Sequence, residues 1–202
     1  MSKINPSLPS INCLPKDGIA YYFGPVFNAA EQGHYFKELL NSIGWESDYV
    51  TLFGKTHITD RKMAFYGDHG VQYKYAGKGY KALEWTEELI ELKKHTEFIT
   101  GENYNACLLN LYHSGKEGMG WHSDNEQEMI SMGSIASLSF GATRPFYFKH
   151  RITGEKHQID LEQGSLLEMK GETQRYWLHQ LPKRLRITTP RINVTFRQFS
   201  MD

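Results

Sequence analysis

Three side chains in the sequence could together hold a metal ion. His122 and Asp124 are two residues apart in GWHSDNE, and His179 lies in WLHQLPK. On a β-strand, residues two apart point to the same face, so an imidazole and a carboxylate could converge on one ion. Two histidines and a carboxylate form the facial triad that leaves positions on iron(II) open for a co-substrate and oxygen. The alternative is a surface His-x-Asp pair and a structural histidine beside Trp177.

The segment PRINVTFRQF near the C-terminus supplies a second signal, because its polar and apolar residues alternate strictly. On a strand, one face would carry Arg191, Asn193, Thr195 and Arg197. Arginines that face inward are costly unless anions meet them, and a guanidinium binds a carboxylate through two parallel hydrogen bonds. A dicarboxylate would satisfy both arginines. The alternative, an edge strand with its arginines in solvent, is disfavoured by the metal-ligand pattern.

The elements that must position these residues differ between the two halves of the chain. Before residue 103 we expect a short strand at 19–23, a helix across AAEQGHYFKELLNSI with Pro25 in its first turn, a strand in SDYVTLFG, a loop or hairpin tip in GKTHITD, and a helix across ALEWTEELIELKKHTEFI. After residue 103, β-rich runs such as RYWLHQL recur at intervals of about 8–12 residues, which is typical of a sandwich or jelly roll. The predicted fold class is α+β, with helices early, a β-sandwich late and one shared core.

Composition excludes several classes of protein. The formal net charge is zero, yet residues 55–81 and 170–197 are basic, so one face can still be positive; the alternative is scattered, solvated charge. Cys13 and Cys107 are too few for a disulfide framework and favour a reducing, intracellular compartment. No signal-peptide core and no run of membrane-spanning length is present, so we expect no membrane association.

The order Asn110-x-Tyr112, His122-x-Asp124, His179 and then the arginine strand resembles the AlkB family of dioxygenases. IASLSFGATRPFYFKH and GSLLEMKGETQRYWLHQLPK also resemble that family, and FGKTHITDRKMAFYGD is similar to the branch that includes bacterial and vertebrate enzymes. The resemblance runs from about Phe53 to Phe199. It implies a double-stranded β-helix (jelly roll) core, with N-terminal helices packed on it and a nucleotide-recognition hairpin region.

The expected domain organisation combines this resemblance with composition, since residues 1 to about 17 are rich in Ser, Pro and Asn and lie outside the resemblance. Residues 1–17 would form an irregular N-terminal arm, and residues 18–202 a single dioxygenase domain. Within that domain, residues 18–102 would hold the helices and the nucleotide-recognition segment. Residues 103–202 would form the jelly-roll core with the metal and co-substrate site.

The resemblance also implies roles for individual residues. The iron ligands would be His122, Asp124 and His179. Arg191 would help to hold one carboxylate of 2-oxoglutarate and Arg197 the other. The co-substrate would also be bound by Asn110, Tyr112 and Asn193.

For the nucleic-acid substrate, the resemblance implies a second group of residues. Tyr73 and Tyr75 would line the base pocket, with the damaged base between Tyr73 and the His122 ring; ordinary cross-strand packing is the alternative for both tyrosines. The pocket floor or rim would carry Asn125 and Glu126. Phe53 would be an aromatic finger or, alternatively, a turn-anchoring core residue. The residues near the nucleic-acid backbone would be Arg61 and Lys62.

Two positions depart from the family pattern. Asn125 stands where this branch often has Asp, which bears on base selectivity, because Asn can donate as well as accept. Asp60 stands where a proline is expected before RK, which bears on the rigidity of the loop that carries Phe53.

The activity implied by the resemblance is oxidative demethylation of N-alkylated bases, of the 1-methyladenine and 3-methylcytosine type, in DNA or RNA. Iron(II) and 2-oxoglutarate would be the cofactors, O2 a co-substrate, and formaldehyde and succinate products. We expect an intracellular monomer without an obligate protein partner, in the cytoplasm of a bacterium or the nucleus of a eukaryote. The alternatives are a 2-oxoglutarate-dependent hydroxylase of a protein or small molecule, and a non-catalytic metal- or nucleic-acid-binding jelly roll. The complete set of triad and arginines argues against the latter.

Overall fold

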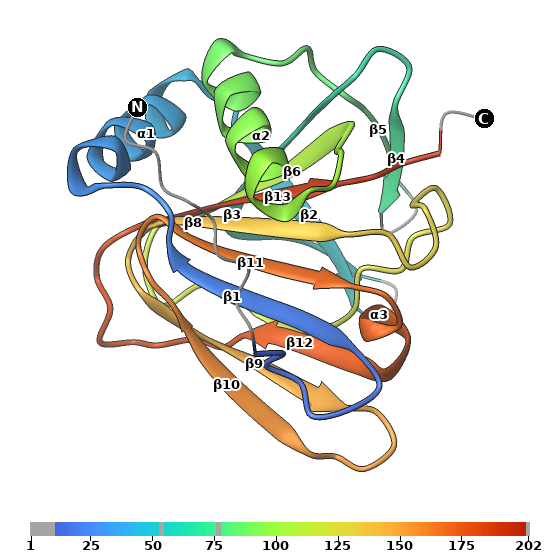
Figure 1. Cartoon of the computed structure of the whole chain (residues 1–202). Helices are drawn as coiled ribbons and strands as arrows, with labels where there is room; N and C mark the ends of the chain where they lie inside the picture. The colour runs from blue at the N-terminus through green and yellow to red at the C-terminus, as the bar shows by residue number, and fades with distance from the viewer. Residues whose placement is uncertain (1–10, 53–54, 76–77, 201–202) are drawn as a thin grey trace.

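The computed structural model describes residues 11–52, 55–75 and 78–200. Figure 1 shows two sheets stacked as layers, with the helices α1 (Ala29–Ser42) and α2 (Glu87–Thr100) on the far side of the larger sheet. This arrangement confirms the predicted α+β fold with a jelly-roll core. Among the described residues, no helix is both long enough and apolar enough to cross a membrane.

The larger sheet contains strands from both halves of the chain. Its order is β1-β11-β8-β13-β6-β3-β2, and all neighbours are antiparallel. The strands are β1 (Ile19–Pro25), β11 (Ser165–Lys170), β8 (Ile135–Gly141), β13 (Arg191–Arg197), β6 (Ala106–Tyr112), β3 (Lys55–Gly67) and β2 (Glu46–Leu52). The early strands expected at 19–23 and in SDYVTLFG are confirmed by β1 and β2. The expectation of a β-sandwich built late in the chain is incomplete, because β1, β2 and β3 all belong to this sheet.

The smaller sheet has the order β10-β9-β12-β7. Its strands are β10 (Lys156–Leu161), β9 (Arg144–His150), β12 (Trp177–Leu181) and β7 (Met119–His122). The strands β4 (Gln72–Tyr75) and β5 (Lys78–Lys81) form a separate hairpin, and the short helix α3 (Thr173–Tyr176) joins β11 to β12. The prediction that RYWLHQL is one strand is therefore wrong at its start, where Tyr176 is helical.

Strand β13 shows how the alternating sequence divides core from cavity. Ile192, Val194 and Phe196 are fully buried in the cluster that also holds apolar side chains of α1 and α2. The intervening polar residues point to the opposite face, toward the smaller sheet, where they line a cavity. Helix packing on one side of this strand thus fixes which of its residues face the site.

Local capping determines where the two long helices begin. Asn28 caps α1: its side chain accepts from the backbone of Glu31, whose carboxylate accepts from the Asn28 backbone. Pro25 consequently ends β1, and its predicted place in the first helical turn is wrong. Helix α2 starts later than predicted, because Thr86 is its N-cap and Leu83 pairs with Tyr66 as an isolated bridge.

The segment GKTHITD was expected to be a loop or hairpin tip. Lys55–Asp60 instead lie within β3, which forms an antiparallel pair with β2, the preceding strand in the sequence. The β-branched residues of this segment suit a paired strand.

Asp124 was expected on the same strand as His122, and this expectation is wrong. It lies two residues beyond the end of β7, so strand alternation does not place it beside His122.

Candidate active site

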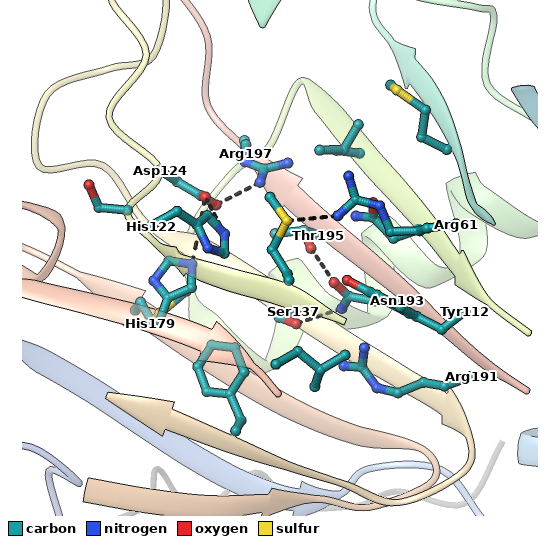
Figure 2. A pocket seen from close by; sticks show the side chains of 18 of the residues that line it. Arg61, Tyr112, His122, Asp124, Ser137, His179, Arg191, Asn193, Thr195 and Arg197 are labelled. Carbon is teal, nitrogen blue, oxygen red and sulfur yellow. Dashed lines mark hydrogen bonds and ion pairs between the residues drawn. The ribbon is translucent and has the colours of Figure 1, made fainter. Parts of the chain in front are cut away.

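A cavity between the two sheets collects most of the residues singled out in the sequence (Figure 2). The larger sheet contributes polar side chains of β6 and β13, and the smaller sheet contributes the two histidines from β7 and β12. The lining residues predicted from sequence are Arg61, Asn110, Tyr112, His122, Asp124, Glu126, His179, Arg191, Asn193, Thr195 and Arg197.

His122, Asp124 and His179 form a compact set of metal-ligand atoms. His122 and His179 are directly paired across β7 and β12, and their ring centroids are 4.2 Å apart. The Nε2 atoms of both histidines lie 3.7 Å from Oδ1 of Asp124. All three ligand atoms are within 4.8 Å of one another. Two imidazole nitrogens and a carboxylate at this separation fit the donor set of a non-haem iron(II) site.

Hydrogen bonding and burial prepare these ligands for a cation. Nδ1 of His122 donates to the Gly120 carbonyl at 2.8 Å, which leaves the Nε2 lone pair directed at the site. Burial, assisted by His179, lowers the pKa of His122 to about 4, so the ring is neutral near pH 7, as a metal ligand must be. Burial alone would raise the pKa of Asp124, but Arg197 and the two histidines hold it well below its ordinary value.

Asp124 owes its position to contacts with distant elements. Nη2 of Arg197 on β13 donates to Oδ2 of Asp124 at 2.6 Å. Oε1 of Gln174 on α3 accepts from the Asp124 backbone N–H at 3.0 Å. Oδ1 of Asp124 thereby faces the two histidines, so Arg197 and Gln174 together orient the carboxylate for the metal.

Arg191 is a buried cation at the side of the cavity away from the histidines (Figure 2). Its Nη2 donates to Ser139 Oγ at 2.9 Å, and its guanidinium lies 5.7 Å from the centroid of the Tyr112 ring. Burial lowers its pKa to about 10. In the part of the chain that the structure describes, no carboxylate pairs with it and its Nε has no hydrogen-bond partner. A buried guanidinium with a free N–H fits one carboxylate of a dicarboxylate.

Asn193 and Asn110 occupy the cavity wall on neighbouring strands, where they pair in register. The Asn193 amide donates to Ser137 Oγ at 2.7 Å and to the Leu138 carbonyl at 3.0 Å, while its Oδ1 accepts from Thr195 Oγ1 at 2.9 Å. These three contacts fix the Asn193 side chain within the wall.

The residues predicted to meet nucleic acid are more dispersed. Arg61 is buried in the cavity wall, where its Nη1 lies 2.8 Å from Met119 Sδ, and Lys62 donates to Ser47 Oγ at 2.8 Å. Asn125 lies with Glu126 at an adjoining hollow. Tyr73 and Tyr75 lie on β4, but their side chains are outside the described part, as is the whole of Phe53.

Sequence reasoning missed several residues that shape the site. Ser137 and Ser139 orient Asn193 and Arg191, and their i, i+2 spacing in the buried strand IASLSF was an available signal. The ring of Phe146 stacks on His179 at 5.4 Å between centroids. Gln174 had no signal in the sequence, because its contact with Asp124 spans 50 residues and depends on the turn of α3.

Comparison with known proteins agrees with this geometry. A family described as the 2OG-Fe(II) oxygenase superfamily matches residues 19–197. DNA oxidative demethylase ALKBH2 of Homo sapiens is 34% identical, with 94% of this chain and 77% of that protein covered. The human alpha-ketoglutarate-dependent dioxygenase alkB homolog 3 is also 34% identical, over 80% of this chain and 59% of its own length. A solved structure of OsALKBH1 has a TM-score of 0.63 and 16% identity, covering 92% of this chain and 98% of that one, which shows the shared fold.

Proposed function

Because this chain belongs to the AlkB family within the 2OG-Fe(II) oxygenase superfamily, we propose that it oxidatively removes N-alkyl groups from bases in DNA. The names of the relatives support the choice of substrate, since ALKBH2 is described as a DNA oxidative demethylase. Bases of the 1-methyladenine and 3-methylcytosine type are the proposed targets. RNA is a further proposed substrate, and the proposed form is an intracellular monomer.

The observation that carries this proposal is the pairing, in one cavity, of the His122–Asp124–His179 set with the buried Arg191. The three ligands would hold iron(II), and Arg191 would hold a carboxylate of 2-oxoglutarate. When bound, iron(II), 2-oxoglutarate and O2 supply the oxidation of an N-methyl carbon, with succinate, carbon dioxide and formaldehyde as products.

The protein's own contribution is orientation and shielding. Gly120 fixes the ring of His122, and Arg197 with Gln174 fixes Asp124. Phe146 and Leu181 line the cavity with apolar surface, which limits water near the ligands. The base-recognition roles are also proposals: Tyr73 and Tyr75 stack on the base, and Asn125 and Glu126 meet its edge. Phe53, Arg61 and Lys62 would contact the rest of the nucleic acid.

A methylated pairing edge cannot be reached inside a duplex, so the target base must be flipped out or start single-stranded. The decisive experiment therefore uses a single-stranded oligonucleotide that carries 1-methyladenine or 3-methylcytosine. The protein is reconstituted anaerobically with iron(II) and 2-oxoglutarate and then exposed to oxygen, and the oligonucleotide is analysed by mass spectrometry.

We expect the oligonucleotide to lose one methylene mass with wild-type protein and to stay unchanged with His122→Ala. Succinate formation beside an unchanged oligonucleotide would retain the dioxygenase chemistry and reject the substrate. If folded, iron-loaded protein forms neither product, the enzymatic proposal fails.

A further inference from the structure

The outer face of the smaller sheet carries aromatic and basic side chains that the proposed reaction does not use. On β9 and β12, Phe146, Phe148 and His179 point inward, to the cavity or the core. Because strand residues alternate in direction, the intervening Tyr147, Lys149, Leu178 and Gln180 point outward. Register pairs Gln180 with Tyr147 and Leu178 with Lys149, so the four form one contiguous patch.

Trp121 extends this patch onto the edge strand β7. It directly precedes His122, which faces inward and pairs with His179. The Trp121 ring lies 6.0 Å from Nζ of the outward-facing Lys149, which places it on the outer face. Trp121 and Tyr147 therefore lie on either side of β12, and both are partly exposed.

Each of these two rings is accompanied by a cation. Nη2 of Arg184 donates to the Tyr147 hydroxyl at 2.9 Å, and its guanidinium lies 5.7 Å from the ring centroid. Nζ of Lys149 lies over the Trp121 ring, 6.0 Å from its centroid. Across the described ranges, neither Arg184 nor Lys149 forms an ion pair with a carboxylate. Two aromatic rings with two uncompensated cations are complementary to a polyanion that has flat bases.

Helices α1 and α2 pack on the larger sheet, on the opposite side of the molecule from this patch (Figure 1). The exposed Lys183 and Arg186 flank Arg184 in the loop after β12 and add positive charge at one end of the patch. A protein-binding surface would favour an apolar centre and few lysines, whereas stacked rings with cations are typical of single-stranded nucleic-acid binding.

We propose that the patch of Trp121, Tyr147, Lys149, Leu178, Gln180 and Arg184 binds the single-stranded nucleic acid that flanks the target base. This inference rests on the proposed function for the identity of the strand. Trp121 directly precedes the metal-ligating His122 and lies on the other face of β7. A nucleic acid whose target base enters the cavity therefore needs only to cross the edge at β7 to reach Trp121. The rings stack on bases of any sequence, and the cations meet the phosphates.

The test compares binding of a long, unmodified, labelled single-stranded oligonucleotide by fluorescence anisotropy with demethylation of a short trinucleotide that carries the lesion at its centre. Removal of one stacking ring, as in Tyr147→Leu or Trp121→Leu, is expected to raise the Kd for the long strand by about 5-fold to 100-fold. Tyr147→Phe and Trp121→Phe retain a ring and should change this Kd by less than about 3-fold. Activity on the trinucleotide should stay near wild type in Tyr147→Leu.

Charge is tested separately from stacking. Lys149→Glu should weaken binding of the long strand and reduce the slope of log K against log salt by about 0.7, the value for one lost phosphate contact on a single strand. The matched control is Lys37→Glu, at an exposed lysine of α1 on the opposite side of the molecule. This variant should leave the affinity for the long strand and its salt dependence unchanged. Mn²⁺ affinity of Trp121→Leu checks that the neighbouring His122 is undisturbed.

The outcomes separate this inference from the proposed function. If Tyr147→Leu and Lys149→Glu bind the long strand as wild type does, while the trinucleotide is demethylated, the patch is not the flanking site. If these variants instead dissociate a dimer seen by sedimentation of the wild type, the face binds a second copy and the inference is overturned. If no oligonucleotide is demethylated but the ring and charge variants weaken strand binding, the surface stands and the proposed chemistry fails.

Discussion

Arg191 shows how a single residue can report the ligand that a site requires. The residue is 2% exposed, yet within the described part of the chain its side chain donates a hydrogen bond only to the neutral Ser139 hydroxyl. Arg144 is equally buried and its Nε also lacks a partner in the described part of the chain, but its terminal nitrogens donate to the backbone carbonyls of Ser114, Glu117 and Pro182. Both arginines face the Tyr112 ring, so the difference between them lies in the polar partners. Arg144 therefore has a structural role, because it connects two loops by hydrogen bonds. The guanidinium of Arg191 is available to bind an anion.

The first prediction concerns this anion. Arg191→Met should raise the Kd of 2-oxoglutarate by about 10-fold to 100-fold, because hydrogen bonds to a charged group contribute about 1.5–3 kcal/mol. Arg191→Lys should restore only part of the affinity for 2-oxoglutarate that Arg191→Met loses, since an ammonium cannot form two parallel hydrogen bonds. Calorimetry on Mn²⁺-loaded protein measures both. Ser139→Ala is the control with a small effect, and an unchanged Kd in Arg191→Met would remove Arg191 from the co-substrate site.

A second prediction concerns Gln174, which acts on the metal through Asp124. Gln174→Leu leaves the Asp124 backbone N–H without its acceptor, so the carboxylate is less well oriented. Loss of such an indirect support typically costs 10-fold to 100-fold in metal affinity. We expect a weakening of about 10-fold for Mn²⁺, with Gln174→Glu, which keeps an acceptor oxygen, closer to wild type. Equal affinities in Gln174→Leu and wild type would mean that Arg197 alone fixes Asp124.

At the scale of elements, the turn between β6 and β7 is held against the loop that follows β12. Gly115 exchanges backbone hydrogen bonds with Arg184 and Ile187. A Cβ at Gly115 would collide with the backbone carbonyl oxygen of Arg184, whereas a Cβ at Gly33 in α1 would meet open space. This close approach sets how β7 and β12 enter the smaller sheet, and therefore how His122 and His179 come to face each other.

The third prediction uses these two glycines as a matched pair. Gly115→Ala should destabilise the protein by about 2–3 kcal/mol, because rigid backbone must shift. Gly33→Ala should stabilise it by about 0.5–1 kcal/mol, as expected for an exposed helix interior. With about 2–4 °C per kcal/mol for a chain of this size, the Tm values should move in opposite directions in a thermal melt. If the Tm values of both variants moved in the same direction, the contact between the β6–β7 turn and the loop after β12 would not be rigid.

At the scale of the whole molecule, the site joins two layers that otherwise meet through side chains. The histidines belong to the smaller sheet, and Arg191 and Arg197 to the larger. A metal and a co-substrate that bind both would cross-link the sheets in the folded state only. Ligands that bind the folded state stabilise it by mass action.

The fourth prediction follows. Mn²⁺ and 2-oxoglutarate, each at about 100 times its Kd, should together raise the Tm by about 10–20 °C, since each such ligand contributes up to about 2.7 kcal/mol. His179→Ala should remain folded in the absence of ligands and lose most of this shift. A shift of equal size in His179→Ala would place the metal outside the proposed triad.

By itself, the sequence determined the chemistry of the site and the class of the fold. The alternation in PRINVTFRQF indicated one polar face on a strand, and β13 has it, because helix packing buries its apolar residues. The histidines and Asp124 were identified by residue type, whereas the cavity-lining Asn110 and Tyr112 were implied by the resemblance to the AlkB family.

Only the tertiary structure decided how these residues meet. Asp124 was expected beside His122 through strand alternation, yet β7 ends at His122, and contacts from α3 and β13 bring the carboxylate back to the site. Pro25 and the segment at Lys55 were also misassigned, because the cap at Asn28 and the pairing of β2 with β3 depend on neighbours that local propensity does not contain. Spacing along a chain specifies which side chains share a face, but long-range packing decides which faces come together.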